Sequence, residues 1–425
     1  MGAAKDSMSP HATHRAHAYA HMYEQYVVEA AFLWVLRAHR VNQPDCTLED
    51  MATLEQRLED QLDGLMASMD TGWTACEAAL EGQEPGEVFT AAVIALRSHE
   101  IPKIQKAVQV GLSSERTSSA LVSALGWLSP EIARPWIERL LNGKDMHHKY
   151  LGVAACSVRR EDPGDILTAI LKREDSRTHA GLYARALRLV GELRRQDLLP
   201  ALIAAQSYDN EAVRFWAGWS AILLGNIVAV KHLQPYVFQP GPLQNKAIQL
   251  VFRVLPIDQA REWISTLSQD KNATRAVITA TGVLGDPHAV NWLITKMADP
   301  LLARLAGEAF TNITGIELAS PSLQRNPPPE RALFPNDDPD DAQVSMDEDE
   351  NLPWPDAEKV VALWRHHGSS FIAGQRYFLG QALTKEVLQH ALTSAYQRQR
   401  HAAALELALI DPQARLINTH AKVIP

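Results

Sequence analysis

Short motifs recur along the middle of this chain at the spacing of a helical repeat. A Gly-x-Leu motif begins at Gly126, Gly191 and Gly282, and the tenth and eleventh residues after each glycine are apolar. Gly225 and Gly315 extend the series, so that two intervals are 34 and 33 residues long and the other two are nearly twice that length. A unit of this size is a pair of helices whose apolar face is buried only when neighbouring units stack. The sequence therefore predicts an all-α fold, an α-solenoid (α-α superhelix) of HEAT-like helical pairs.

A second set of regularly spaced residues supports the helical repeat. Two units carry an Asp, an Arg five residues later and a Gly sixteen residues after the Asp, namely Asp209, Arg214, Gly225 and Asp299, Arg304, Gly315. The set Asp270, Arg275 and Gly285 follows this pattern to within one residue, and Asp175 with Gly191 keeps only the outer spacing. We expect the Asp to cap the second helix of each unit, and the Gly to end that helix in the left-handed conformation. The Arg is expected to bridge to the Asp or to a carbonyl of an adjacent unit.

The stretches outside the repeats differ from them in composition. The N-terminal segment is polar and rich in His and Ala, and the segment after Leu318 contains three consecutive prolines and the acidic run Asp347–Glu350. Apolar residues at helical spacing return after Pro355. The predicted regions are a disordered polar tail (1–22), an N-terminal helical cap (23–83), the HEAT-like solenoid (84–318), an acidic Pro-rich flexible linker (319–355) and a C-terminal helical module (356–425). Whether this module caps the solenoid or stands apart is left open.

Charge and cysteine usage exclude several classes of function. The chain has 41 Lys and Arg against 50 Asp and Glu, a formal net charge of -9, which argues against general binding to nucleic acid. Cys46, Cys76 and Cys156 are far apart and odd in number, as expected for buried free thiols in a reducing compartment. The longest N-terminal apolar run, residues 27–36, is too short to cross a bilayer. These features predict a cytoplasmic protein that neither enters a membrane nor binds nucleic acid.

Motifs for catalysis are missing from the sequence. We find no phosphate-binding glycine loop, no G-x-S-x-G elbow and no H-E-x-x-H helix. The pair His99-Glu100 stands alone, whereas the iron sites of HEAT-like hydroxylases need three or four such ligands, so we interpret it as an exposed turn. His14, His17 and His21 fit a solvated polar tail better than a metal site. The chain is therefore predicted not to be an enzyme, with no cofactor and no metal.

Five side chains are the candidates for a protein-binding surface. Arginine and aromatic residues dominate the energetics of protein interfaces, and the best concentration of them outside the repeats is Trp364, Arg376, Tyr377, Arg398 and Arg400. We expect them to cluster near one end of the array. An alternative for Tyr377 is that it belongs, with Phe378, to the core of a terminal cap. Alternatives for Arg398 and Arg400 are a solvated helix start and contact with this chain's own acidic linker.

Tryptophans at repeat positions allow two interpretations. Trp136 and Trp292 recur beside apolar neighbours, and we predict that they pack between helices. Trp127 and Trp219 have less clearly apolar neighbours. For these two, core packing and an aromatic binding groove remain equally good interpretations.

A family resemblance covers nearly the whole chain. The repeats resemble the HEAT-like units first noted in phycobilisome lyases. More specific are the motifs Phe32–Arg37, Leu54–Leu58 running on to Leu65, Gly72-Trp73, Glu87–Phe89, Leu352–Asp356 and Gly374–Gly380. They resemble an uncharacterised family of proteobacterial HEAT-like repeat proteins, often encoded beside type VI secretion components and effectors.

Three functions follow as expectations. The first is a cytoplasmic adaptor or chaperone that holds a type VI secretion effector or spike protein on the concave face of the solenoid. The second is an immunity-type inhibitor that binds a toxic effector, and only inhibition of the toxin separates it from the first. The third, from another class, is a HEAT-like enzyme acting on nucleic acid or a tetrapyrrole. The partner's identity and the oligomeric state are left open.

Overall fold

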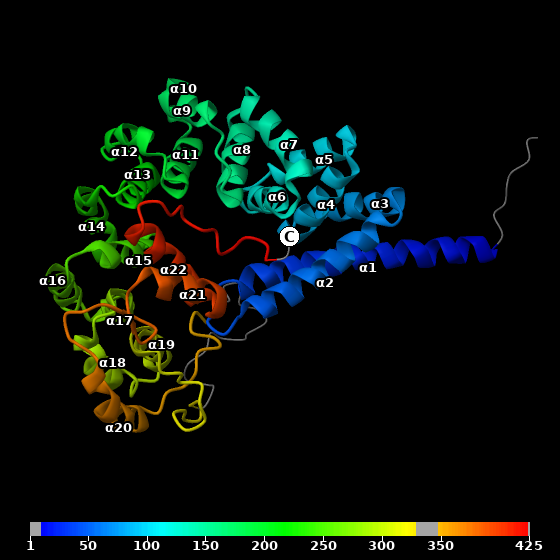
Figure 1. Ribbon diagram of the computed structural model, residues 1–425. Helices are drawn as coiled ribbons and strands as arrows, with labels where there is room; N and C mark the ends of the chain where they lie inside the picture. Colours follow the sequence, from blue (N-terminus) through cyan, green and yellow to red (C-terminus); the bar gives the residue numbers. More distant parts are fainter. Residues whose placement is uncertain (1–9, 329–346, 424–425) are drawn as a thin grey trace, which may run out of the picture. The chain divides into compact units, whose positions relative to one another are not determined.

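The computed structural model describes residues 10–328 and 347–423, which are predominantly α-helical (Figure 1). The one sheet among these residues is a hairpin of two short strands, β1 (Tyr377–Phe378) and β2 (Gln381–Ala382). The prediction of an all-α fold is confirmed. The described residues divide into two compact units, the first made of residues 10–42, 48–189 and 420–423, and the second of residues 43–47, 190–328 and 347–419.

The first unit stacks consecutive helical pairs. Helix α4 packs on α6, and α6 packs on α8, so that every second helix lies against the next. This is the packing expected of a helical repeat, in which one unit covers the apolar face of its neighbour. The helices are α1 (Pro10–Arg40), α2 (Leu48–Met66), α3 (Met69–Ala79), α4 (Pro85–Ser98), α5 (Ile101–Gly111), α6 (Glu115–Trp127), α7 (Pro130–Asn142), α8 (Met146–Arg159), α9 (Asp165–Lys172), α10 (Glu174–Thr178) and α11 (Ala180–Leu193), whose last residues enter the second unit.

Helix α1 begins earlier than the sequence analysis expected. Residues 10–22 were assigned to a disordered tail, but they form the first turns of this helix. Pro10 suits the first helical position, and Ala12, Ala16, Ala18 and Ala20 have the highest helix propensity of all residues. The predicted tail is therefore wrong for residues 10–22, and residues 1–9 lie outside the described part of the chain.

The second unit continues the same packing. Helix α15 packs on α17, and α17 packs on α19, while the intervening helices pack beside their own partners. The helices are α12 (Leu199–Ala205), α13 (Glu211–Leu223), α14 (Val230–Phe238), α15 (Gln244–Val254), α16 (Ile257–Leu267), α17 (Thr274–Leu284), α18 (Val290–Lys296), α19 (Ala303–Thr314), α20 (Ala357–His367), α21 (Lys385–Ser394) and α22 (Gln397–Ile410).

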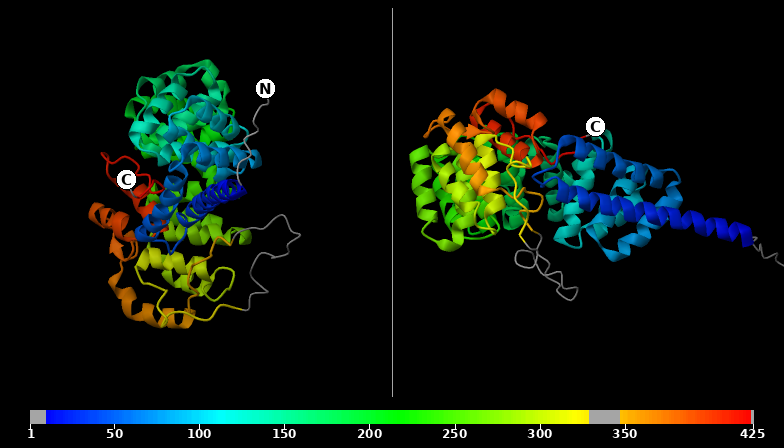
Figure 2. Two further views of the ribbon diagram at one scale, coloured as in Figure 1. Left: turned by 90° about the vertical axis from the view of Figure 1, so that its right-hand side faces the viewer. Right: turned by 90° about the horizontal axis from the view of Figure 1, so that it is seen from below.

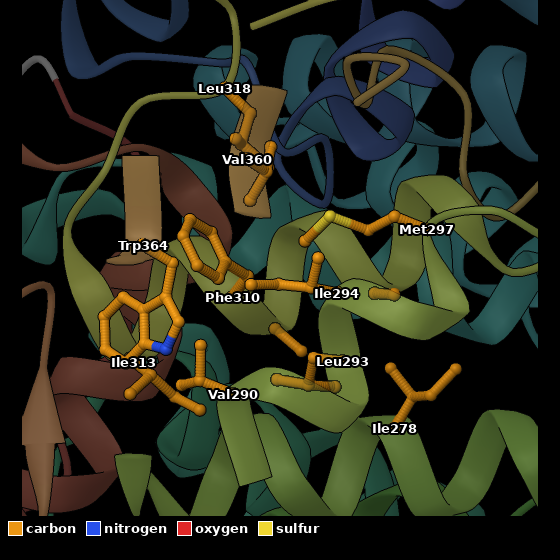
Figure 3. Close-up of a cluster of buried hydrophobic side chains, with 12 residues drawn as sticks. Ile278, Val290, Leu293, Ile294, Met297, Phe310, Ile313, Leu318, Val360 and Trp364 are labelled. Atoms are coloured by element: carbon orange, nitrogen blue, oxygen red, sulfur yellow. The ribbon is translucent and has the colours of Figure 1, made fainter. Parts of the chain in front are cut away.

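The C-terminal helices belong to the second unit. Helix α20 packs beside α18, α21 packs on α22, and α22 contacts α15 (Figure 2). Phe310 of α19 and Trp364 of α20 share one buried cluster, in which their ring centroids are 6.1 Å apart (Figure 3). Each buried side chain of this size contributes about 1.5–3 kcal/mol. The question left open by the sequence is thus answered, because these helices pack on the repeats.

The predicted glycine caps are largely confirmed. Gly285 and Gly315 end α17 and α19 with φ angles of +73° and +68°, and Gly225 follows α13 with a φ of +90°. Gly191 is an exception, because α11 continues to Leu193. A Cβ at Gly191 would lie 2.6 Å from Ser220 Oγ, so this glycine permits close helix packing instead.

The predicted aspartate caps are only partly correct. The side chain of Asp299 accepts a hydrogen bond from the Leu301 amide at 3.0 Å, in the turn before α19. At α13 the cap is Asn210, whose side chain accepts from the Val213 amide at 3.1 Å. The prediction for Asp209 is wrong because the neighbouring asparagine is an equally good cap.

Two further sequence expectations concern burial. All three cysteines are buried and none is in a disulfide, and burial raises the pKa of Cys76 to about 12. Trp127 and Trp219 are buried, whereas Trp136 and Trp292 are only partly so. Trp127 and Trp219 are therefore more completely buried than the sequence indicated. Within residues 10–328 and 347–423, no helix is both long and apolar enough to cross a membrane.

Candidate functional site

The segment that contains Arg376 and Tyr377 lies across the ends of the repeat helices. The Tyr377 amide donates to the Gly285 carbonyl at the end of α17 at 2.8 Å, and the Leu379 amide donates to the Asn312 carbonyl of α19 at 2.8 Å. Leu379 and Gly380 both have positive φ, as a two-residue hairpin turn requires. The backbone of the segment is thus held by the carbonyl ends of α17 and α19.

Arg376 joins three elements at the same place. Its guanidinium donates to the carbonyls of Leu284 at 2.9 Å and Arg253 at 2.9 Å, and it also pairs with the Glu406 carboxylate of α22. Carbonyls at helix C-termini favour a cation because the helix dipole is negative there. Arg376 is therefore engaged within the chain rather than directed at solvent.

The other predicted aromatic residues are core residues. Trp364 is 9% exposed and lies in the buried cluster of α17 to α20 (Figure 3). Tyr377 packs against the same cluster. Phe378 is buried with Leu388 in a second cluster, which residues of α21 and α22 form. These positions agree with the alternative that Tyr377 and Phe378 belong to the core of a terminal cap. The expectation that Trp364 is an exposed contact is wrong, because the side chain fills the space between α19 and α20.

Arg398 and Arg400 also have partners within the chain. Arg398 pairs with Glu308 of α19 at 3.1 Å and donates to the Glu348 carbonyl at 2.8 Å. Arg400 donates to the Leu392 carbonyl at the end of α21 at 2.7 Å. The structure thus favours the second interpretation for Arg398, contact with this chain's own acidic segment. A binding role for the five predicted residues stays a prediction.

The acidic segment is held by two of the repeat arginines. Arg275 makes a bidentate pair with Asp349 at 2.7 and 2.8 Å, and Arg304 binds Asp347 at 2.7 Å and the Asp349 carbonyl at 2.9 Å. The Arg304 guanidinium also lies 4.6 Å from the centroid of the Trp354 ring. We call Arg275 and Arg304 the arginine pair. Each is the second residue of its helix, so the aspartates also lie near the positive helix ends of α17 and α19.

Both described ends of the predicted flexible linker are ordered against other residues. Asp349 is only 4% exposed, and the Arg325 amide donates to the Trp354 carbonyl at 3.0 Å. The prediction of a flexible linker is wrong for residues 319–328 and 347–355, because the arginine pair and this backbone pairing fix them. Residues 329–346 lie outside the described part of the chain.

A second segment, residues 420–423, is bound in the first unit. Arg37 of α1 donates to the carbonyls of His420 at 3.0 Å and Ala421 at 3.1 Å, while Glu55 of α2 accepts from the Val423 amide at 2.7 Å. Arg37 and Glu55 also pair with each other at 2.7 Å, and Glu55 is fully buried. This charged pair therefore binds the backbone of the segment through both its carbonyls and an amide.

The lysine of that segment enters a pocket of its own, which we call the lysine pocket. Lys422 pairs with Glu59 of α2, and its ammonium lies 4.9 Å from the centroid of the Trp127 ring. Trp127 donates from Nε1 to Glu59 at 3.1 Å, and Arg97 of α4 donates to Glu59 at 2.6 Å. Burial alone would raise the pKa of Glu59, but Lys422 and Arg97 hold it below its usual value. Glu59 is therefore ionised at neutral pH.

Sequence reasoning missed the lysine pocket, although it cited some of the residues around it. Arg37 and Glu55 lie in the motifs Phe32–Arg37 and Leu54–Leu58, which were used only for the resemblance. The signal that could have found them is a charged residue on the apolar face of each helix, because a buried charge needs an oppositely charged or hydrogen-bonding partner. No local pattern links them to Lys422.

Metal ligands do not gather anywhere in the described residues. No group of three or more His, Cys, Asp or Glu side chains in residues 10–328 and 347–423 is placed to hold a metal ion. His99 and Glu100 are exposed in the turn between α4 and α5, as expected from the sequence.

Comparison with known proteins gives no family. No protein-family model, no curated protein and no solved structure matches the chain. What the chain does is therefore inferred from its own residues and contacts.

Proposed function

We propose that this chain is a non-enzymatic scaffold that binds an acidic segment of a partner protein through the arginine pair. One observation supports this most strongly: Arg275 and Arg304 already hold an acidic turn of this chain, residues 347–349, by its side chains and its backbone. Bidentate arginine–carboxylate pairs are both strong and directional. Helical repeats commonly use such surfaces to bind extended chains.

The chain's own acidic segment occupies the site in this state. A tethered segment has a high effective concentration, so a partner must supply more contacts than Asp347 and Asp349 do. Binding would then involve exchange of one acidic segment for another at the same arginines. The motif resemblance suggests the partner, a type VI secretion effector or spike component, and the role of a cytoplasmic adaptor or chaperone.

Replacing the two aspartates that occupy the arginine pair tests this function in cells. Tagged full-length protein carrying Asp347→Ser and Asp349→Ser is compared with the same protein that also carries Arg275→Ala and Arg304→Ala. We expect a partner to co-purify with the first variant, to be lost from the second, and to be displaced by a synthetic peptide of residues 347–354. Mass spectrometry that finds the same proteins with both variants would contradict the proposal. A partner that is a toxin, and is inhibited on binding, would indicate the immunity role instead.

A further inference from the structure

We propose that the lysine pocket is a second binding site, specific for a peptide segment of another protein that carries a lysine. Residues 420–423 are its occupant in the isolated chain. This site lies in the first unit, whereas the arginine pair lies in the second, and it binds through acidic and aromatic groups instead of arginines alone.

The backbone contacts make the site one for a peptide segment. Arg37 donates to two successive carbonyls, of His420 and Ala421, and Glu55 accepts from the Val423 amide. These bonds involve no side chain of the segment, so other sequences that adopt the same bent backbone can form them. Arg37 and Glu55 also pair with each other at 2.7 Å, so each orients the other towards the segment.

The side-chain contacts provide selectivity for lysine. The ammonium of Lys422 meets a carboxylate, Glu59, on one side and the Trp127 ring on the other. Glu59 is fixed by hydrogen bonds from Arg97 and from the indole of Trp127, so its oxygens do not need to reorient. Ion pairing combined with cation–π contact favours a cation strongly over a neutral side chain of the same length.

Glu59 and Glu55 are positioned together by α2. They are four residues apart, and residues at this spacing lie on the same face of a helix. One face of α2 thus supplies the acceptor for the peptide amide and the acceptor for the lysine side chain. A peptide that places a lysine directly before the bonded amide satisfies both at once, as Lys422 and Val423 do.

A peptide titration tests the site in the full-length chain. The Lys422→Ala variant weakens the occupant, and a fluorescent peptide of residues 417–423 then reports binding by anisotropy. We expect the variant to bind this peptide at least about tenfold more tightly than the wild type does, because the wild-type segment competes. A matched peptide with norleucine in place of the lysine should bind about tenfold more weakly, because it lacks the charge.

Two further variants locate the effect. Glu59→Gln in the Lys422→Ala background should remove the preference for lysine over norleucine, whereas Glu138→Gln, an exposed change on α7, should keep it. If Lys422→Ala loses its helical circular dichroism, the full-length Lys422→Met variant, which keeps the length of the side chain but not its charge, serves for the same comparison. Equal binding of the two peptides, or no saturable binding, would overturn the proposal. Arg275→Ala with Arg304→Ala should leave this binding unchanged, which separates its failure from that of the proposed function.

Discussion

Replacing Glu406 with alanine is expected to lower the free energy of unfolding by about 3–5 kcal/mol, because it leaves buried arginines without their counter-charge. Glu406 is 2% exposed and lies between Arg253 and Arg376. Burial lowers the pKa of Arg253 to about 10, an effect that the Glu406 carboxylate opposes. Arg253 is therefore charged at neutral pH, with Glu406 as its counter-charge.

The matched control is Glu406→Gln. Glutamine keeps the volume of the side chain and one acceptor oxygen, so its loss should be clearly smaller than that of alanine. Urea unfolding followed by circular dichroism measures both. A loss below about 1 kcal/mol for Glu406→Ala would show that the cluster does not anchor α22 to the repeats.

Replacing Gly285 with alanine is expected to cost about 3 kcal/mol, from two separate sources. Its φ of +73° is unfavourable for any residue with a Cβ. A Cβ there would also lie 2.4 Å from the Tyr377 carbonyl oxygen, so the hairpin of β1 and β2 would have to move. The substitution thus tests how firmly the hairpin is held on the end of α17.

Gly225 offers the comparison that separates the two sources. It too has a positive φ, +90°, but a Cβ there would meet no atom within 4 Å. Gly225→Ala should therefore cost only the backbone strain, about 1–2 kcal/mol. Urea unfolding of both variants gives the difference. Equal losses of unfolding free energy in the two variants would mean that the hairpin moves away from residue 285 without cost.

Local features of the fold could be predicted from the sequence because the residues responsible are neighbours in the chain. The glycine caps at Gly285 and Gly315 follow from the end of an amphipathic pattern and the need for a left-handed residue. The same local rule failed at Asp209, because Asn210 beside it is an equally good cap. The regular spacing of Asp, Arg and Gly cannot show which of two adjacent residues caps the helix.

The candidate sites could not be predicted, because each joins residues that are distant in sequence. The acidic run was expected to be flexible from its composition, but Asp349 is buried because Arg275 lies opposite it, 74 residues away. Likewise, Lys422 meets Glu59 and Trp127, which lie on different helices. Composition describes the segment alone, whereas its order depends on partners that only the fold provides.

Both segments nevertheless follow one physical rule. A short non-helical piece of the chain supplies a charge, and neighbouring helices supply the opposite charge together with groups that bond the backbone. For the arginine pair, Asp349 contributes both its carboxylate and its carbonyl. For the lysine pocket, Lys422 contributes the charge while its neighbours contribute the backbone groups. The account of this chain as a binder of short charged segments depends on these sites accepting a segment that is not covalently attached.

Titration of a labelled peptide of residues 347–354 into the full-length chain tests that claim most directly. The wild type should bind it weakly, because its own segment occupies the arginine pair, and the Asp347→Ser, Asp349→Ser variant should bind it saturably at micromolar concentration. Adding Arg275→Ala and Arg304→Ala should abolish this binding, whereas adding Arg365→Ala, an exposed change on α20, should not affect it. Anisotropy that shows no saturable binding to the opened variant, or binding that survives the loss of both arginines, would contradict the account.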